Sequence, residues 1–143
     1  MATYNKFQDF VERVLLAVHN FDAAGHVFKI YLSDTAPAAT NTIKADIAEI
    51  SAGNGYTAGG EDTQNTLAEA SGTATVTGTK VVWTASGGNI GPFRYVILYN
   101  DTDVSDRLVS WWDYGSSITL LPGETFTVKF NNGDPTGTIF TLA

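Results

Sequence analysis

Only two side chains in this sequence, His19 and His26, can act as imidazole bases near neutral pH. Neither belongs to a catalytic or zinc-binding pattern, because the sequence contains no Gly-x-Ser-x-Gly and no His-Glu-x-x-His motif. Cysteine is absent, which excludes thiolate nucleophiles, disulfides and cysteine–zinc sites. His19 lies at the end of a predicted helix, where it suits the negative end of the helix dipole. We therefore expect a capping or surface role for it.

Acidic side chains are numerous but do not form a known site. Asp101, Asp103 and Asp106 share one loop, and Asp113 follows seven residues later. This spacing lacks the glycine and the terminal glutamate of a helix–loop–helix calcium site, so we expect a solvated hairpin tip. The glutamates are scattered, whereas a glycosidase needs two carboxylates facing each other across a cleft. We predict that the protein is not an enzyme and holds no cofactor and no metal ion.

Two glycine-containing runs, Ala52–Gly60 and Ser86–Gly91, lack the Gly-Lys-Ser/Thr ending of a phosphate-binding loop. No strand-to-helix step surrounds either of them. We expect both runs to be turns.

Aromatic residues are the remaining candidates for binding, because flat rings stack on sugars and also anchor protein interfaces. Trp111 and Trp112 are adjacent in a predicted strand, so their side chains must point to opposite faces, one into the core and one outward. We favour a protein interface and keep a carbohydrate-binding face as the alternative. The candidate interface residues are Tyr56, Leu67, Arg94, Trp111, Trp112 and Tyr114.

The second half of the chain has the alternating pattern of β-strands with turn residues between them. In Phe93–Asn100, Phe93, Tyr95, Ile97 and Tyr99 alternate with Arg94, Val96 and Leu98. The other predicted strands are Thr73–Thr77 and Lys80–Thr84, which form a hairpin around Gly78-Thr79, then Leu108–Tyr114, Thr125–Phe130 and Thr138–Leu142. About seven strands in all predict a mainly β fold, an antiparallel, jelly-roll-like β-sandwich spanning residues 74–143.

The N-terminal part predicts an amphipathic helix over residues 5–20, with Asn5 as its cap. Its apolar stripe is Phe7, Phe10, Val11, Val14, Leu15 and Val18. The polar face carries both charges, which favours packing on the core over binding to a membrane surface. Residues 26–50 then predict the strand His26–Leu32 and a short helix marked by Ile43, Ile47 and Ile50.

Residues 51–73 form a glycine-rich segment with only two large apolar side chains, Tyr56 and Leu67. Such a composition buries too little area to become ordered by itself. We therefore predict a long irregular loop or arm that becomes ordered against another polypeptide.

The length of 143 residues fits a single domain over residues 1–143. Eight basic and fifteen acidic side chains give a net charge of −7, which opposes binding to nucleic acid and to anionic lipids. The first ten residues lack the pattern of a signal peptide, and no stretch approaches the roughly 18 apolar residues of a membrane span. We expect neither a nucleic acid nor a membrane as partner.

Several stretches resemble small virion structural proteins of tailed bacteriophages. The matching stretches are Asp46–Ile50, Ser51–Gly60, Gly91–Thr102, Trp112–Ser117 and the closing residues 137–143. The resemblance covers most of the chain and implies a capsid decoration (cement) protein, which binds the outside of the major capsid protein shell and strengthens it. It also implies a homotrimer on the exterior of the virion, made in the cytoplasm of the host bacterium. The alternatives are a tail or head–tail component, a carbohydrate-binding module and a small hydrolase.

Overall fold

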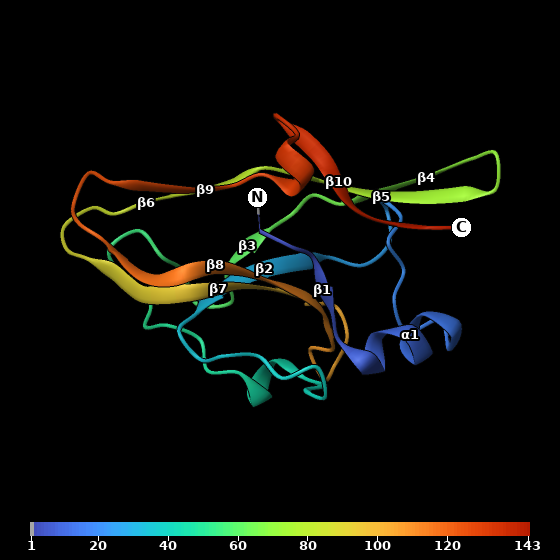
Figure 1. The fold of residues 1–143 in the computed structure, drawn as a ribbon, viewed down its shortest axis with the longest axis horizontal. Helices are drawn as coiled ribbons and strands as arrows, with labels where there is room; N and C mark the ends of the chain where they lie inside the picture. The colour runs from blue at the N-terminus through green and yellow to red at the C-terminus, as the bar shows by residue number, and fades with distance from the viewer. Residues whose placement is uncertain (1) are drawn as a thin grey trace.

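The computed structural model describes residues 2–143 as two layers of antiparallel β-strands with one short helix, α1, near the N-terminus (Figure 1). One layer is a five-stranded sheet in the order β1-β8-β7-β2-β3. The other layer consists of the three-stranded sheet β10-β5-β4 and the two-stranded sheet β6-β9. The predicted mainly β, antiparallel sandwich with an N-terminal helix is confirmed, although the sandwich is not closed.

The elements have the following bounds. The strands of the five-stranded sheet are β1 (Asn5–Lys6), β2 (Phe28–Ser33), β3 (Glu61–Asp62), β7 (Ile90–Asn100) and β8 (Leu108–Leu120). The strands of the other layer are β4 (Thr66–Ala70), β5 (Thr73–Thr79), β6 (Val81–Thr84), β9 (Thr125–Val128) and β10 (Thr136–Leu142). The helix is α1 (Gln8–Leu15), and two 3₁₀ turns are η1 (Lys44–Asp46) and η2 (Phe130–Asn132).

The central strand β7 is buried on both faces. Val96 and Leu98 face the second layer, whereas Ile97 and Tyr99 face the opposite side. The alternation predicted for Phe93 is wrong, because Phe93 lies with Val96 and Leu98. Phe93 pairs with Ile118 and Tyr95 with Asp113, so β8 contains extra residues between these pairs. This bulge, residues 114–117, lies opposite the part of β7 where the alternation breaks, since Phe93 and Val96 both face the second layer.

The outer face of the five-stranded sheet is covered by residues 34–50, which run along it and include η1 (Figure 1). The buried cluster there consists of Phe7, Tyr31, Ile47, Ile97, Tyr99 and Leu108. The helix predicted around residues 43–50 is wrong, because only the single turn η1 forms. Asp46 Oδ2 accepts hydrogen bonds from the backbone N–H groups of Thr42 and Ile43, which closes this turn locally.

The first half of the glycine-rich segment is held in place by a hydrogen-bond cluster around Glu49. The hydroxyl of Tyr56 donates to Glu49 Oε1 (2.7 Å) and accepts from the N–H of Leu32 (3.1 Å). The N–H of Gly59 donates to the same carboxylate oxygen (2.6 Å). Gly60 has φ +74° and lies so close to the carbonyl of Ile30 that no Cβ fits there. Tyr56, predicted as an interface residue, is instead a core anchor, only 3% exposed.

The second half of the glycine-rich segment is not a loop, because Thr66–Ala70 forms strand β4. Strand β4 pairs with β5 through the two-residue turn Ser71-Gly72, both residues having positive φ. Such a turn matches the twist of a hairpin. The predicted hairpin around Gly78-Thr79 is therefore wrong: both residues lie within β5, and β6 pairs with β9. In Figure 1 the β4–β5 hairpin extends past the end of the five-stranded sheet.

Helix α1 is shorter than predicted. Asn5 belongs to β1 and does not cap the helix, and Gln8–Leu15 is helical. Phe7 and Phe10 are buried and Val14 is partly buried against the core, whereas Val11 and Leu15 are exposed, so only part of the predicted stripe packs. The ring of Phe10 makes edge-to-face contacts with Phe21 and Phe140, which joins α1 to β10.

Replacing Phe10 with Ala should lower the free energy of unfolding by about 3–5 kcal/mol, because it leaves a cavity among buried rings. Chemical denaturation measures this change. Leu15→Ala, on the same helix but at an exposed position, is the control and should leave stability nearly unchanged. Equal effects of the two substitutions would contradict the packing described for α1.

The substitution Tyr56→Phe should cost about 1–3 kcal/mol, because it leaves the N–H of Leu32 without its hydrogen-bond acceptor. It should also speed proteolysis within residues 51–60. Tyr114→Phe, which alters an exposed tyrosine, serves as the matched control. Unchanged stability and protease resistance in Tyr56→Phe would show that the cluster around Glu49 does not hold this segment.

Candidate functional site

The described residues contain no group of three or more histidine and acidic side chains placed to hold a metal ion. In the acidic loop, Asp101 forms an ion pair with Lys29 (2.8 Å). The carboxylate of Asp103 accepts a hydrogen bond from the N–H of Ser105 and lies near Arg107. The carboxylates of Asp101 and Asp103 thus have partners within the chain.

His19 is buried, which corrects the expected capping or surface role. Its ring lies among Phe10, Phe21 and Phe28, and its Nδ1 is 3.1 Å from the side-chain amide nitrogen of Asn100. Burial lowers the pKa of His19 to about 4. The imidazole is therefore neutral at physiological pH and belongs to the core.

The two adjacent tryptophans lie on opposite faces of β8, and both are partly buried. Trp111 packs against Phe7 (4.6 Å between ring centres) on the outer side of the sheet. Trp112 packs against Tyr4 and Phe130 between the two layers. Neither indole lies fully exposed on an outer surface.

The other predicted interface residues do not form one surface. Arg94 makes a two-bond ion pair with Asp113 (2.7 and 2.9 Å), which lowers the pKa of that carboxyl group. Leu67 is 43% exposed on the edge strand β4, and Tyr114 is 54% exposed on the bulge of β8. The structure therefore separates the six residues into a core anchor, an ion pair, two packed indoles and two exposed positions.

A surface missed in the sequence lies on the outer face of β4, β5 and β10, which we call the threonine face. Cross-strand neighbours share this face: Thr66 pairs with Thr77, which pairs with Thr138, and Thr75 pairs with Thr141. The full set is Thr66, Ala68, Ala70, Thr73, Thr75, Thr77, Thr79, Thr136, Thr138 and Thr141. None of these side chains is ionisable. Threonine at every second position from 73 to 79 was the signal that could have revealed it.

Most positively charged side chains of the protein, including two beside the threonine face, are paired with carboxylates of the same chain. Seven of the eight lysine and arginine side chains form ion pairs within the chain; these are Arg13, Lys29, Lys44, Lys80, Arg94, Arg107 and Lys129. At the border of the threonine face, Lys80 and Lys129 both contact Asp134 (2.7 Å each).

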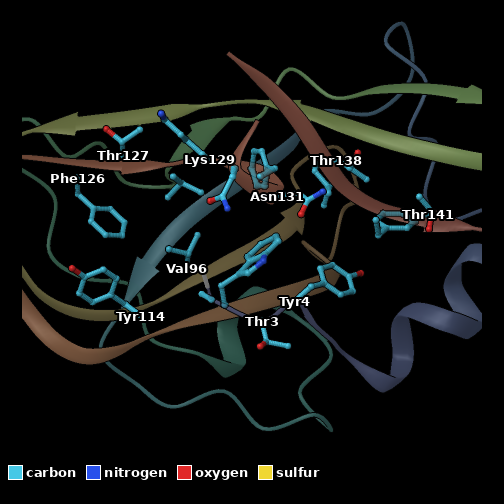
Figure 2. A pocket seen from close by; sticks show the side chains of 17 residues that line it. Thr3, Tyr4, Val96, Tyr114, Phe126, Thr127, Lys129, Asn131, Thr138 and Thr141 are labelled. Carbon is cyan, nitrogen blue, oxygen red and sulfur yellow. The ribbon is translucent and has the colours of Figure 1, made fainter. Parts of the chain in front are cut away.

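A groove of about 980 Å³ opens between the two layers on the side where β8 faces β9, η2 and β10 (Figure 2). Six aromatic residues line it: Tyr4, Trp112, Tyr114, Phe126, Phe130 and Phe140. The rest of the lining consists of threonines, two asparagines, the apolar residues Ala2, Val96, Val128 and Ile139, and Lys129. The hydroxyl of Tyr4 is buried here, and this burial raises its pKa to about 12.

Comparisons with known protein families, with curated proteins and with solved structures found no match to this chain. Within residues 2–143, no helix is both long enough and apolar enough to cross a membrane. The threonine face and the groove are the two surfaces on which a function can be argued.

Lowering the pH from 6.5 to 4 should destabilise the protein through His19. In the unfolded chain His19 binds a proton near pH 6.5, whereas in the folded chain His19 binds it only near pH 4. The stability contributed by neutral His19 is therefore complete above pH 6.5 and decreases by up to about 3 kcal/mol as the pH falls to 4. NMR titration of the His19 ring should give a pKa near 4. A pKa near 6.5 would contradict the burial of this ring.

Proposed function

We propose that this protein is a structural component of a tailed-phage virion, a capsid decoration protein that binds the outer surface of the major capsid protein shell and stabilises it. The stretches that resemble phage virion proteins support this proposal. The observation that carries it is the threonine face, a sheet surface with ten uncharged side chains on a protein of net charge −7.

The threonine face has the properties of a docking surface. Its side chains are short and mostly β-branched, so they lose little conformational freedom on contact. The absence of charges means that no ion has to be desolvated when a partner covers the face. The hydroxyl groups can still form hydrogen bonds, as Thr66 and Thr77 already do with each other (2.7 Å between their Oγ1 atoms).

The size of the threonine face suggests how the protein would attach. Three strands spaced ~4.8 Å apart, with about six residues each at ~3.3 Å per residue, present on the order of 300 Å². A stable interface buries about 800 Å² on each partner. One copy would therefore bind weakly by this face alone, and a homotrimer at three-fold or quasi-three-fold positions would add three such contacts.

The charge distribution supports attachment without ion pairs. Because nearly all the cations are already paired within the chain, few remain to attract an acidic partner. Exposed ion pairs are weakened by salt, whereas contacts between uncharged groups are not. In this proposal the protein is made in the bacterial cytoplasm and remains on the capsid exterior at high ionic strength.

The substitution Thr75→Arg should weaken binding to purified capsids by at least about tenfold, because it buries an unpaired cation in the centre of the interface. Co-sedimentation with capsids that lack the protein measures this. Thr57→Arg, at an exposed position outside the threonine face, is the control and should bind like the unmodified chain. Binding of the unmodified chain should also persist in about 1 M NaCl, where the Debye length is about 3 Å.

Two outcomes would contradict the proposal. Equal binding by Thr75→Arg and the unmodified chain would exclude the threonine face, and release by salt alone would show that ion pairs dominate. Melting temperatures of both variants verify that each is folded.

A further inference from the structure

The groove between the layers is a second surface, and its six aromatic residues distinguish it from the threonine face, with which it shares Thr138 and Thr141. Aromatic rings form its walls: Tyr114 meets Phe126 edge to face (5.6 Å between ring centres, 76°), and Trp112 meets Tyr4 in the same way (5.7 Å, 71°). Figure 2 shows Tyr114 and Phe126 on facing walls at one end and Tyr4 near the other. Rings fixed by such contacts provide rigid flat surfaces for a ligand.

The polar part of the groove lies on η2, where Asn131 and Asn132 follow Phe130. Both asparagines have a left-handed backbone, with φ of 45° and 56°. Left-handed backbone is uncommon outside glycine, although asparagine adopts it more readily than most residues, and it occurs in turns as well as at ligand sites. Neither side-chain amide has a hydrogen-bond partner within residues 2–143. The NH2 group and the carbonyl oxygen of each asparagine are therefore free to bind a ligand at the groove.

The groove has almost no charge to offer. No carboxylate lines it, and the single cation, Lys129, is already bound to Asp134. A charged ligand would find no partner of opposite sign here, so the ligand must be neutral. It must also combine apolar faces with several hydroxyl or amide groups, because the lining combines aromatic rings with free amides and threonine hydroxyls.

We infer that this groove binds a neutral oligosaccharide. The C–H faces of the sugar rings lie on Tyr114 and Trp112, and the sugar hydroxyls bond to the amides of Asn131 and Asn132. The volume of about 980 Å³ is at the upper end of the ~300–1,000 Å³ of ligand pockets, which suits a short oligosaccharide better than a single sugar. The groove shares Thr138 and Thr141 with the threonine face, but Tyr114, Trp112, Asn131 and Asn132 lie outside that face, so substitutions at these positions test saccharide binding separately from capsid binding.

The test is titration of the isolated protein with maltotriose, cellotriose and chitotriose, followed by NMR of the backbone amides. At least one trisaccharide should shift the resonances of the groove at concentrations on the order of 10 mM or below. Tyr114→Ala and Asn131→Gly should each weaken that binding by at least about fivefold. Glycine at position 131 keeps the left-handed backbone and removes only the amide. Asn89→Gly, which removes an exposed amide outside the groove, should bind like the unmodified chain.

Three results would overturn the inference. The first is that no trisaccharide shifts the groove resonances. The second is that Tyr114→Ala and Asn131→Gly bind as tightly as the unmodified chain. The third is that capsid protein, but no saccharide, shifts the resonances of Tyr114 and Asn131, which lie in the groove outside the threonine face; this result would assign the groove to a polypeptide. Melting curves establish that each variant is folded before its binding is compared.

Discussion

Burial of the central strand β7 on both faces is the constraint on which the rest of the structure depends. A sheet with apolar side chains on both faces needs other parts of the chain packed against each face. The second β layer covers one face, and residues 34–50 cover the other, where Glu49 accepts a hydrogen bond from Tyr56. Tyr56 packs with Trp83 between the layers and also bonds to Glu49, so the Ser51–Gly60 run is held within the chain.

Much of the fold follows from local patterns in the sequence. Alternation of apolar residues correctly predicts strands at β2, β7, β8, β9 and β10, because one or both faces of each strand are buried. The pairing of β5 with β4 was missed, because β4 is exposed at every residue and has no apolar alternation. The bulge at residues 114–117 was also missed, since its position depends on the partner strand and not on local sequence.

The candidate sites were harder to predict than the strands. Large residues such as Tyr56 and Trp112 attract attention as binding residues, yet the same properties place them in the core or against it. The threonine face consists of residues that are individually unremarkable, and only cross-strand register brings them together. Similarly, the groove joins the N-terminal residues to β8, η2 and β10, which are far apart in the chain.

The central claim is that this chain is a virion protein attached to the capsid exterior through the threonine face. A cryo-EM map of the phage particle tests it most directly. The account predicts many copies of this β-sandwich on the outside of the shell, with β4, β5 and β10 against the major capsid protein. A map in which this face points to solvent, or in which the protein occurs only in the tail or is absent from the particle, would contradict the account.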